Sequence, residues 1–83
     1  MFHKVSDVKP LENFELLVSF IGGEKKIYDV KPLFEKWEIF RSLKTINGLF
    51  QCVRVDTGGY GIVWNDEIDL ACDELWEEGA LCR

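Results

Sequence analysis

The sequence is poor in the side chains on which most metal and nucleophilic sites depend. Its 83 residues hold one histidine, His3, and three widely spaced cysteines, Cys52, Cys72 and Cys82, with no Cys-x-x-Cys pair. Transition metals need clustered histidine or cysteine ligands, and the acidic residues 66–69 lack the spacing and glycine of a calcium loop. We therefore expect no metal and no cofactor.

Long apolar runs are also missing. The best stretch, residues 14–22, is about half of what a membrane-spanning helix needs. No charged and then apolar leader opens the chain, and the cysteines are odd in number, so we expect a cytoplasmic protein with free thiols. Cys52 is expected in the core and Cys82 in a frayed tail. With 47% hydrophobic and 13% aromatic residues, the chain is predicted to form a single folded domain over residues 1–83.

The pattern of turns and alternating residues predicts an α+β domain with a mostly antiparallel sheet of about five strands. Strands are expected at residues 3–8, 14–20, 25–30, 49–56 and 60–64, with a short extended segment at 68–70. Gly22-Gly23 and Thr57-Gly58-Gly59 provide the hairpin turns. One helix is predicted from Pro32 to Asn47-Gly48, and a second over residues 72–78, capped by Asp69 or Asp73 and stopped at Gly79.

Charge is distributed unevenly along the chain. The net charge is −5, from 10 basic and 15 acidic residues. Seven of the acids fall within residues 65–78, a segment that holds no base. This sign opposes nucleic-acid binding, which depends on neutralising phosphates. The ordinary explanation of such a run is a solvated surface, and the alternative is a face for a basic partner.

Two tryptophans flank the acidic segment. Tryptophan is enriched at interface hot spots, so one exposed beside the acids would favour an interface, whereas core packing is expected for at least one of them. The predicted partner-binding residues are Trp64, Asp66, Glu67, Asp69, Asp73, Glu74 and Trp76. The partner is a basic protein or a second copy of the chain, with neither nucleic acid nor membrane expected.

No arrangement of residues indicates an enzyme. His3 has no neighbouring nucleophile or acid in a recognisable pattern, and the glycines at 58, 59 and 61 join two strands rather than opening a phosphate-binding helix. Asp56 or Asp69 acting as a base is the weakest hypothesis, since it would require a carboxylate in a pocket. We expect a protein that is not an enzyme.

The ordered set of short motifs resembles the small bacterial family known as domain of unknown function 2442. The resemblance covers nearly all of residues 3–78. It depends on Val8-Lys9-Pro10, Leu16-Leu17-Val18-Ser19-Phe20, Gly22-Gly23-Glu24, Tyr28-Asp29-Val30, Pro32-Leu33, Phe40, Leu43, Phe50, Val53, Gly61-Ile62-Val63-Trp64, Ile68-Asp69-Leu70, Asp73 and Leu75.

This resemblance implies an α+β fold without an established activity and supplies no catalytic residues. Some members are similar to the antitoxin half of toxin–antitoxin pairs, and others are joined to a C-terminal helix-turn-helix. The chain ends at Arg83 without room for such a helix pair, so direct DNA binding is not expected. Two hypotheses follow. The first is an antitoxin-like interaction module for a co-encoded small protein, and the second is a small-ligand sensor or dimerisation domain associated with transcriptional regulation.

Overall fold

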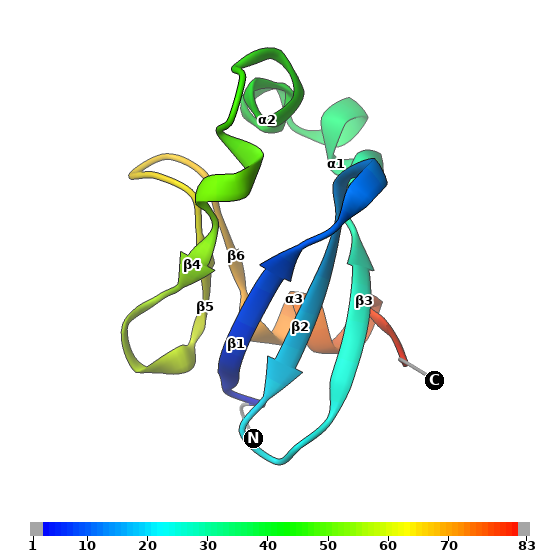
Figure 1. The fold of residues 1–83 in the computed structure, drawn as a ribbon, viewed down its shortest axis with the longest axis vertical. Helices are drawn as coiled ribbons and strands as arrows, with labels where there is room; N and C mark the ends of the chain where they lie inside the picture. Colours follow the sequence, from blue (N-terminus) through cyan, green and yellow to red (C-terminus); the bar gives the residue numbers. More distant parts are fainter. Residues whose placement is uncertain (1–2, 82–83) are drawn as a thin grey trace.

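The computed structural model describes residues 3–81, which form an α+β fold of two antiparallel sheets and short helices (Figure 1). The first sheet has the strand order β1-β2-β3-β7, and the second has the order β4-β5-β6. The strands of the first sheet are β1 (Val5–Pro10), β2 (Glu15–Phe20), β3 (Lys25–Asp29) and β7 (Ala80–Leu81). Those of the second are β4 (Arg54–Val55), β5 (Gly61–Val63) and β6 (Asp69–Ala71). The predicted fold class is confirmed, although the strands are divided between two sheets.

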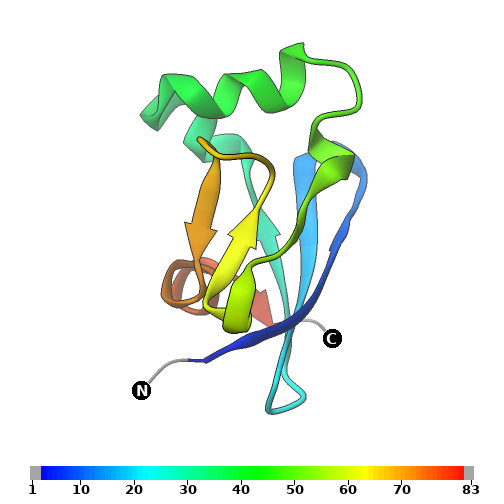
Figure 2. The same ribbon diagram turned by 90° about the vertical axis from the view of Figure 1, so that its left-hand side faces the viewer.

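The helices lie in two places, at one end of the molecule and behind the sheets (Figure 1). Helices α1 (Lys31–Lys36) and α2 (Ser42–Thr45) cross one end of both sheets, whereas α3 (Cys72–Glu78) lies behind them (Figures 1 and 2). Residues 3–81 also contain four 3-10 turns, at Glu12–Phe14, Glu38–Arg41, Phe50–Cys52 and Thr57–Gly59. No helix among residues 3–81 is long and apolar enough to cross a membrane.

The first hairpin follows the sequence pattern closely. Leu16, Val18 and Phe20 of β2 are buried and alternate with half-buried residues, as expected for a strand with one face on the core. Gly23 has a φ of +98° in the turn, a conformation that glycine adopts without steric cost. The second hairpin turn, at residues 57–59, is also confirmed, with β4 and β5 pairing on either side of it.

The predicted helix from Pro32 to Asn47 is wrong in one respect, because it breaks at Trp37. That residue is extended, with φ −132° and ψ 118°, and its side chain is 54% exposed. The break frees the carbonyl of Phe34, which accepts a 2.8 Å hydrogen bond from Nε of Arg41. A side chain thus satisfies a helix-terminal carbonyl, and the turn after the break places Phe40 in the core.

The predicted strand at residues 49–56 is correct only for Arg54–Val55. Its first half is the 3-10 turn Phe50–Cys52, which buries Phe50 and leaves Cys52 exposed. The expectation that Cys52 lies in the core is therefore wrong, because burial here follows a three-residue period rather than alternation. Cys72 is the buried thiol, and Cys82 lies outside the described residues.

The C-terminal helix has the predicted bounds, but its predicted cap is wrong. Ala71 occupies the N-cap position and no side chain caps the helix, while Asp73 lies in the first turn. Gly79 follows the last helical residue. A Cβ there would lie 2.5 Å from the carbonyl oxygen of Leu75, so the backbone needs glycine for close packing rather than for a left-handed φ.

The core is shared by both sheets and contains a group of aromatic rings around Trp64. Trp64 is 2% exposed, and its Nε1 donates a 3.1 Å hydrogen bond to the carbonyl of Phe50. The rings of Phe40 and Phe50 lie 6.2 and 6.4 Å from Trp64, measured between centroids. No buried side-chain polar atom lacks a hydrogen-bond partner among the described residues. Burial of these rings and of their aliphatic neighbours is the main source of stability.

Candidate functional site

The acidic residues predicted to bind a partner lie on the surface, but they do not form one compact cluster. Asp66 and Glu67 are exposed in the loop at one end of β6, Asp69 is exposed on β6, and Asp73 and Glu74 lie at its other end, in α3. Together with Glu77 and Glu78 of α3, which were not among the predicted binding residues, these five acids make up what we call the acidic band. Its members are Asp66, Glu67, Asp69, Asp73, Glu74, Glu77 and Glu78.

The loop at the start of the band is held by Asn65. Its Oδ1 accepts hydrogen bonds of 2.9 Å from the backbone N–H groups of both Glu67 and Ile68. Ile68 is buried, and Asp66 and Glu67 remain exposed between these anchors. An asparagine side chain thus builds the turn that holds the two acids on the surface.

The two tryptophans of the predicted interface are not free surface anchors. Trp64 is buried in the core, so its inclusion in an exposed binding face is wrong, and core packing explains it. Trp76 is half-buried and already covered. The His3 ring stacks on it with centroids 3.6 Å apart, the Phe20 ring meets it edge-on at 5.0 Å, and Nζ of Lys26 lies 4.1 Å from the ring centroid.

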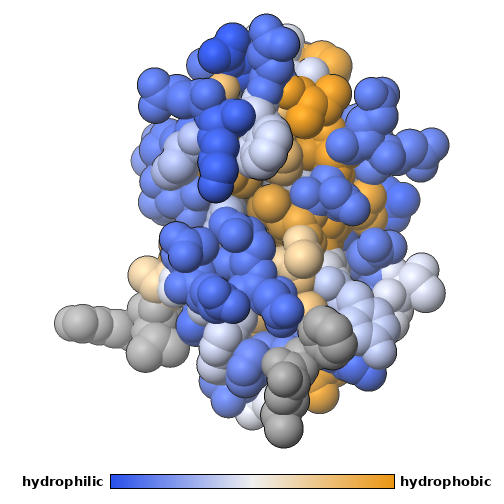
Figure 3. Space-filling model, turned by 180° about the vertical axis from the view of Figure 1, so that it is seen from behind, coloured by the Kyte–Doolittle hydropathy of each residue, from blue (hydrophilic) through white to orange (hydrophobic). Residues whose placement is uncertain are grey.

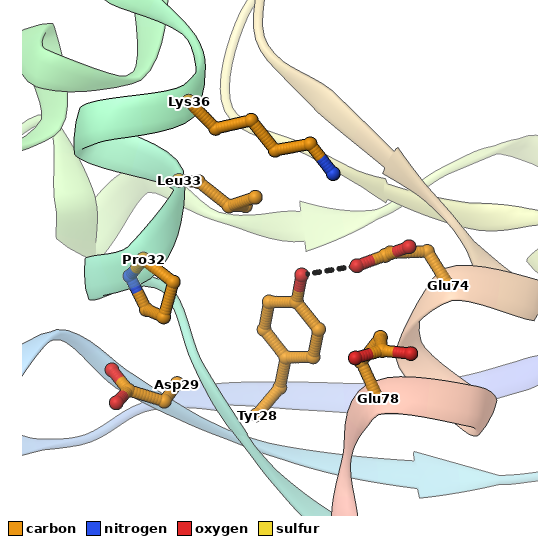
Figure 4. Close-up of a pocket in the computed structure, with 7 residues that line it drawn as sticks. All are labelled: Tyr28, Asp29, Pro32, Leu33, Lys36, Glu74 and Glu78. Atoms are coloured by element: carbon orange, nitrogen blue, oxygen red, sulfur yellow. Dashed lines mark hydrogen bonds between the residues drawn. The ribbon is translucent and has the colours of Figure 1, made fainter.

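A cavity of about 210 Å³ lies between α1 and α3, over the end of β3 (Figure 4). Its lining residues are Tyr28, Asp29, Pro32, Leu33, Lys36, Glu74 and Glu78. Only Glu74 among them belongs to the predicted site. Glu78 lies one turn further along α3, the remaining five come from elements some 40 residues earlier in the chain, and no spacing in the sequence pairs Tyr28 with Glu74. The packing of α3 against β3 brings them together.

A hydrogen bond between Tyr28 and Glu74 forms one side of the cavity. The Tyr28 hydroxyl donates to Oε2 of Glu74 at 2.7 Å. Burial, together with the Glu74 carboxylate, raises the pKa of the Tyr28 phenol far above its ordinary value of 10. The phenol therefore stays protonated and acts as a fixed donor. It positions the half-buried carboxylate of Glu74.

Charge in the cavity is only partly balanced. Asp29 pairs with Lys31 at 2.9 Å, which is the one salt bridge among residues 3–81. Lys36 extends from α1 over the cavity, opposite Glu74 and Glu78 (Figure 4), without forming an ion pair within 4.0 Å. The carboxylates of Glu74 and Glu78 therefore lack a cationic partner in the described part of the chain. The arrangement attracts cations.

The remaining reactive groups are not assembled into a site. Burial and the neighbouring Asp73 carboxylate raise the pKa of the Cys72 thiol, so this sulfur is protonated as well as buried. Asp56 and Asp69 are both exposed. No group of three or more histidine, cysteine or acidic side chains among the described residues could hold a metal ion.

Comparison with known families agrees with the motif pattern. The model of the family described as protein of unknown function, DUF2442, matches residues 5–80. The chain belongs to this family. Membership in DUF2442 confirms the resemblance drawn from the motifs, and the match extends from β1 to β7. No curated protein and no solved structure matches the chain, so the cavity and the acidic band of this DUF2442 protein must be interpreted from their own chemistry.

Proposed function

We propose that this chain is a cytosolic, non-enzymatic protein-interaction module, an antitoxin-like partner of a co-encoded small basic protein. The acidic band faces that partner. The main observation behind the proposal is that the carboxylates of the band have no basic partners. None of its seven carboxylates lies within 4.0 Å of a basic group in residues 3–81, and six of them are exposed.

Unpaired like charges have an energetic consequence. They repel one another in the free protein and lower its stability, most strongly at low ionic strength. A basic partner removes this repulsion when it binds, and the same field accelerates its approach. The band therefore favours association with a positively charged surface. The expected signature is an affinity that falls as salt is added.

The apolar part of the proposed interface is formed by residues other than Trp64 and Trp76. Hydrophobic residues gather over the α1–α2 end of the molecule and continue toward the middle of the rear face, with hydrophilic residues on both sides (Figure 3). Trp37, Ile39 and Ile46 belong to this end and are 54%, 40% and 55% exposed. The partner is therefore expected to combine basic side chains with an apolar contact.

Two protonated groups support binding rather than catalysis. The Tyr28 phenol is held protonated as a donor to Glu74, and Cys72, the buried thiol among residues 3–81, is protonated too. General acid–base catalysis requires a group whose pKa lies near the operating pH, and these two groups are shifted away from neutrality.

The test is co-expression with the product of the neighbouring gene, followed by co-purification and calorimetry at several salt concentrations. Asp66→Asn/Glu67→Gln/Asp73→Asn neutralises three exposed carboxylates of the band without altering the cavity lining. We expect at least tenfold weaker binding and a shallower salt dependence.

A matched variant removes the same charge elsewhere. Asp7→Asn/Glu12→Gln/Glu35→Gln changes three exposed carboxylates outside the band and should bind almost as the wild type does. Equal affinity and equal salt dependence for both variants would mean that the band is not the binding face.

A second candidate function is a dimerisation or ligand-sensing domain. It is favoured by the exposure of Trp37, Ile39 and Ile46, which a second copy of the chain could cover. Sedimentation equilibrium distinguishes the two. A dimer whose mass is independent of concentration, and which Ile46→Glu converts to a monomer, supports this second function. A monomer at all concentrations contradicts a dimerisation role and does not support this second function.

A further inference from the structure

We propose that the cavity between α1 and α3 receives one arginine side chain of the partner. This inference rests on the proposed function, because it names the group that would anchor a basic protein to the acidic band. The size of the cavity, its lining and its hydrogen-bond acceptors each support the binding of a guanidinium group.

The size of the cavity suits a single side chain. Its volume of about 210 Å³ is below the range of roughly 300–1,000 Å³ that is usual for small-molecule and cofactor pockets. Its walls belong to two short helices and its floor to the end of β3, so it is open to a group that approaches from the surface (Figure 4). Long side chains of a protein partner reach such depressions without any backbone entering them.

The walls suit the two parts of an arginine side chain. Pro32 is exposed and offers apolar surface for the methylene stem. Leu33 and Tyr28 are buried, with 6% and 3% of their surface exposed, so they hold the lining in place but offer little surface of their own. A guanidinium is more weakly hydrated than an ammonium group, so it loses less hydration when it enters the cavity.

The acceptors are placed to bind a forked donor. Glu74 and Glu78 are four residues apart on α3 and therefore project from the same side of the helix. The Tyr28 hydroxyl occupies Oε2 of Glu74 and leaves Oε1 without a partner in residues 3–81, and Glu78 has no hydrogen-bond partner there either. A guanidinium has five N–H donors in one plane and can bridge two carboxylates, whereas an ammonium is a point charge.

Lys36 provides a test of whether the cavity binds a positively charged group. Its ammonium extends over the cavity from the α1 side and repels an incoming cation (Figure 4). Replacing Lys36 by methionine keeps an unbranched apolar stem and removes the charge, so Lys36→Met should strengthen arginine binding. A cavity with only a structural role predicts no such gain.

The experiment titrates the ¹⁵N-labelled full chain with N-acetyl-arginine amide and follows the backbone amides by NMR. We expect saturable shifts centred on Leu33, Lys36, Glu74 and Glu78, with a Kd of about 1–10 mM, as befits one side chain. N-acetyl-lysine amide should bind at least about threefold more weakly, and the neutral citrulline analogue should give no saturable shift.

Variants assign the shifts to the cavity. Glu74→Gln retains an acceptor for Tyr28, and both Glu74→Gln and Glu78→Gln should weaken arginine binding about three- to tenfold. Asp7→Asn removes one exposed carboxylate from β1 and serves as the matched control, with unchanged binding expected. Lys36→Met should bind about two- to threefold more tightly.

Three results overturn the inference: no saturable shift up to about 20 mM, equal binding of the arginine, lysine and citrulline probes, or shifts spread over all surface acids rather than the cavity. The two proposals fail separately. If the arginine probe does not bind but the triple variant of the band still weakens the partner complex, the cavity assignment alone is wrong. If the probe binds but the band variant leaves the complex intact, the proposed function is wrong.

Discussion

The hydroxyl of Tyr28 donates a hydrogen bond to Glu74, and this bond joins strand β3 to helix α3 across 46 residues of sequence. A hydrogen bond to a charged acceptor contributes about 1.5–3 kcal/mol, and less when the acceptor is partly exposed to water, as Glu74 is. The bond therefore has both a structural and a site-building role. It fixes α3 against the first sheet and orients a carboxylate at the cavity.

Removing the hydroxyl tests its structural contribution. We expect Tyr28→Phe to lower the free energy of unfolding by about 1–2 kcal/mol, because the ring stays packed while the donor to Glu74 is lost. The measurement is urea unfolding followed by far-UV circular dichroism. Glu35→Gln, at an exposed position of α1, is the control and should stay within about 0.5 kcal/mol of the wild type. Identical stabilities for all three proteins would show that the bond contributes nothing.

The same phenol predicts a loss of stability in alkali. Its pKa is higher in the folded protein than the ordinary value of 10, so above about pH 10 the unfolded chain releases a proton that the folded chain retains. Stability attributable to Tyr28 is therefore complete below pH 10 and falls as the pH rises beyond it.

For one proton, the free energy of unfolding should fall by up to about 1.4 kcal/mol per pH unit. The measurement compares the free energies of unfolding of wild type and Tyr28→Phe at pH 9, 10 and 11. Other titrating groups largely cancel when one free energy is subtracted from the other. The stability gap between the two proteins should shrink with pH. A gap that is constant or grows contradicts the raised pKa.

Trp64 and Trp37 form a matched pair for testing the core. Trp64→Phe removes the donor to the Phe50 carbonyl and leaves space in a buried site, so we expect a loss of about 2 kcal/mol. Trp37→Phe changes a side chain that is 54% exposed and should cost less than about 0.5 kcal/mol. Chemical denaturation compares them. If the two variants lose the same stability, the break at Trp37 or the burial of Trp64 is described wrongly.

Gly61 and Gly22 provide a second pair. A Cβ at position 61 would collide with the carbonyl oxygen of Leu70 and lie 3.2 Å from Cα of Ala71, both of them backbone atoms of the neighbouring strand. Gly61→Ala should therefore cost about 2 kcal/mol or more. At Gly22 the nearest atom is Oε1 of Glu24, the end of a flexible side chain that can move, so Gly22→Ala should be nearly neutral. Thermal unfolding measures both, and a Gly61→Ala protein as stable as the wild type would contradict the close strand packing.

Local signals predicted the local structure. The alternation in residues 14–20, the glycines at 22–23 and 58–59 and the bounds of the last helix are encoded within a few neighbouring residues. The strand, the two turns and the helix are confirmed, although the predicted helix cap is not. The break at Trp37 depends instead on how the following turn packs against the core. Phe40 must reach the core, and Arg41 compensates the freed carbonyl of Phe34.

The site was less predictable for the same reason. Exposure of the acids follows from their charge, because ionised side chains are rarely buried without a partner. The cavity does not, because Tyr28, Leu33 and Glu74 meet only after the hairpin and α3 have packed. Trp64 shows the opposite error: its position beside the acids in sequence suggested an interface, whereas its ring packs in the core with Phe40 and Phe50.

Chain connectivity around α3 has a mechanical consequence. β6, α3 and β7 follow one another almost without intervening residues, so one continuous segment contributes a strand to each sheet and the helix between them. Displacement of α3 would therefore remove an outer strand from both sheets at once. The amides of the two sheets are thus expected to lose protection together in hydrogen exchange, and a ligand that binds α3 would protect both sheets.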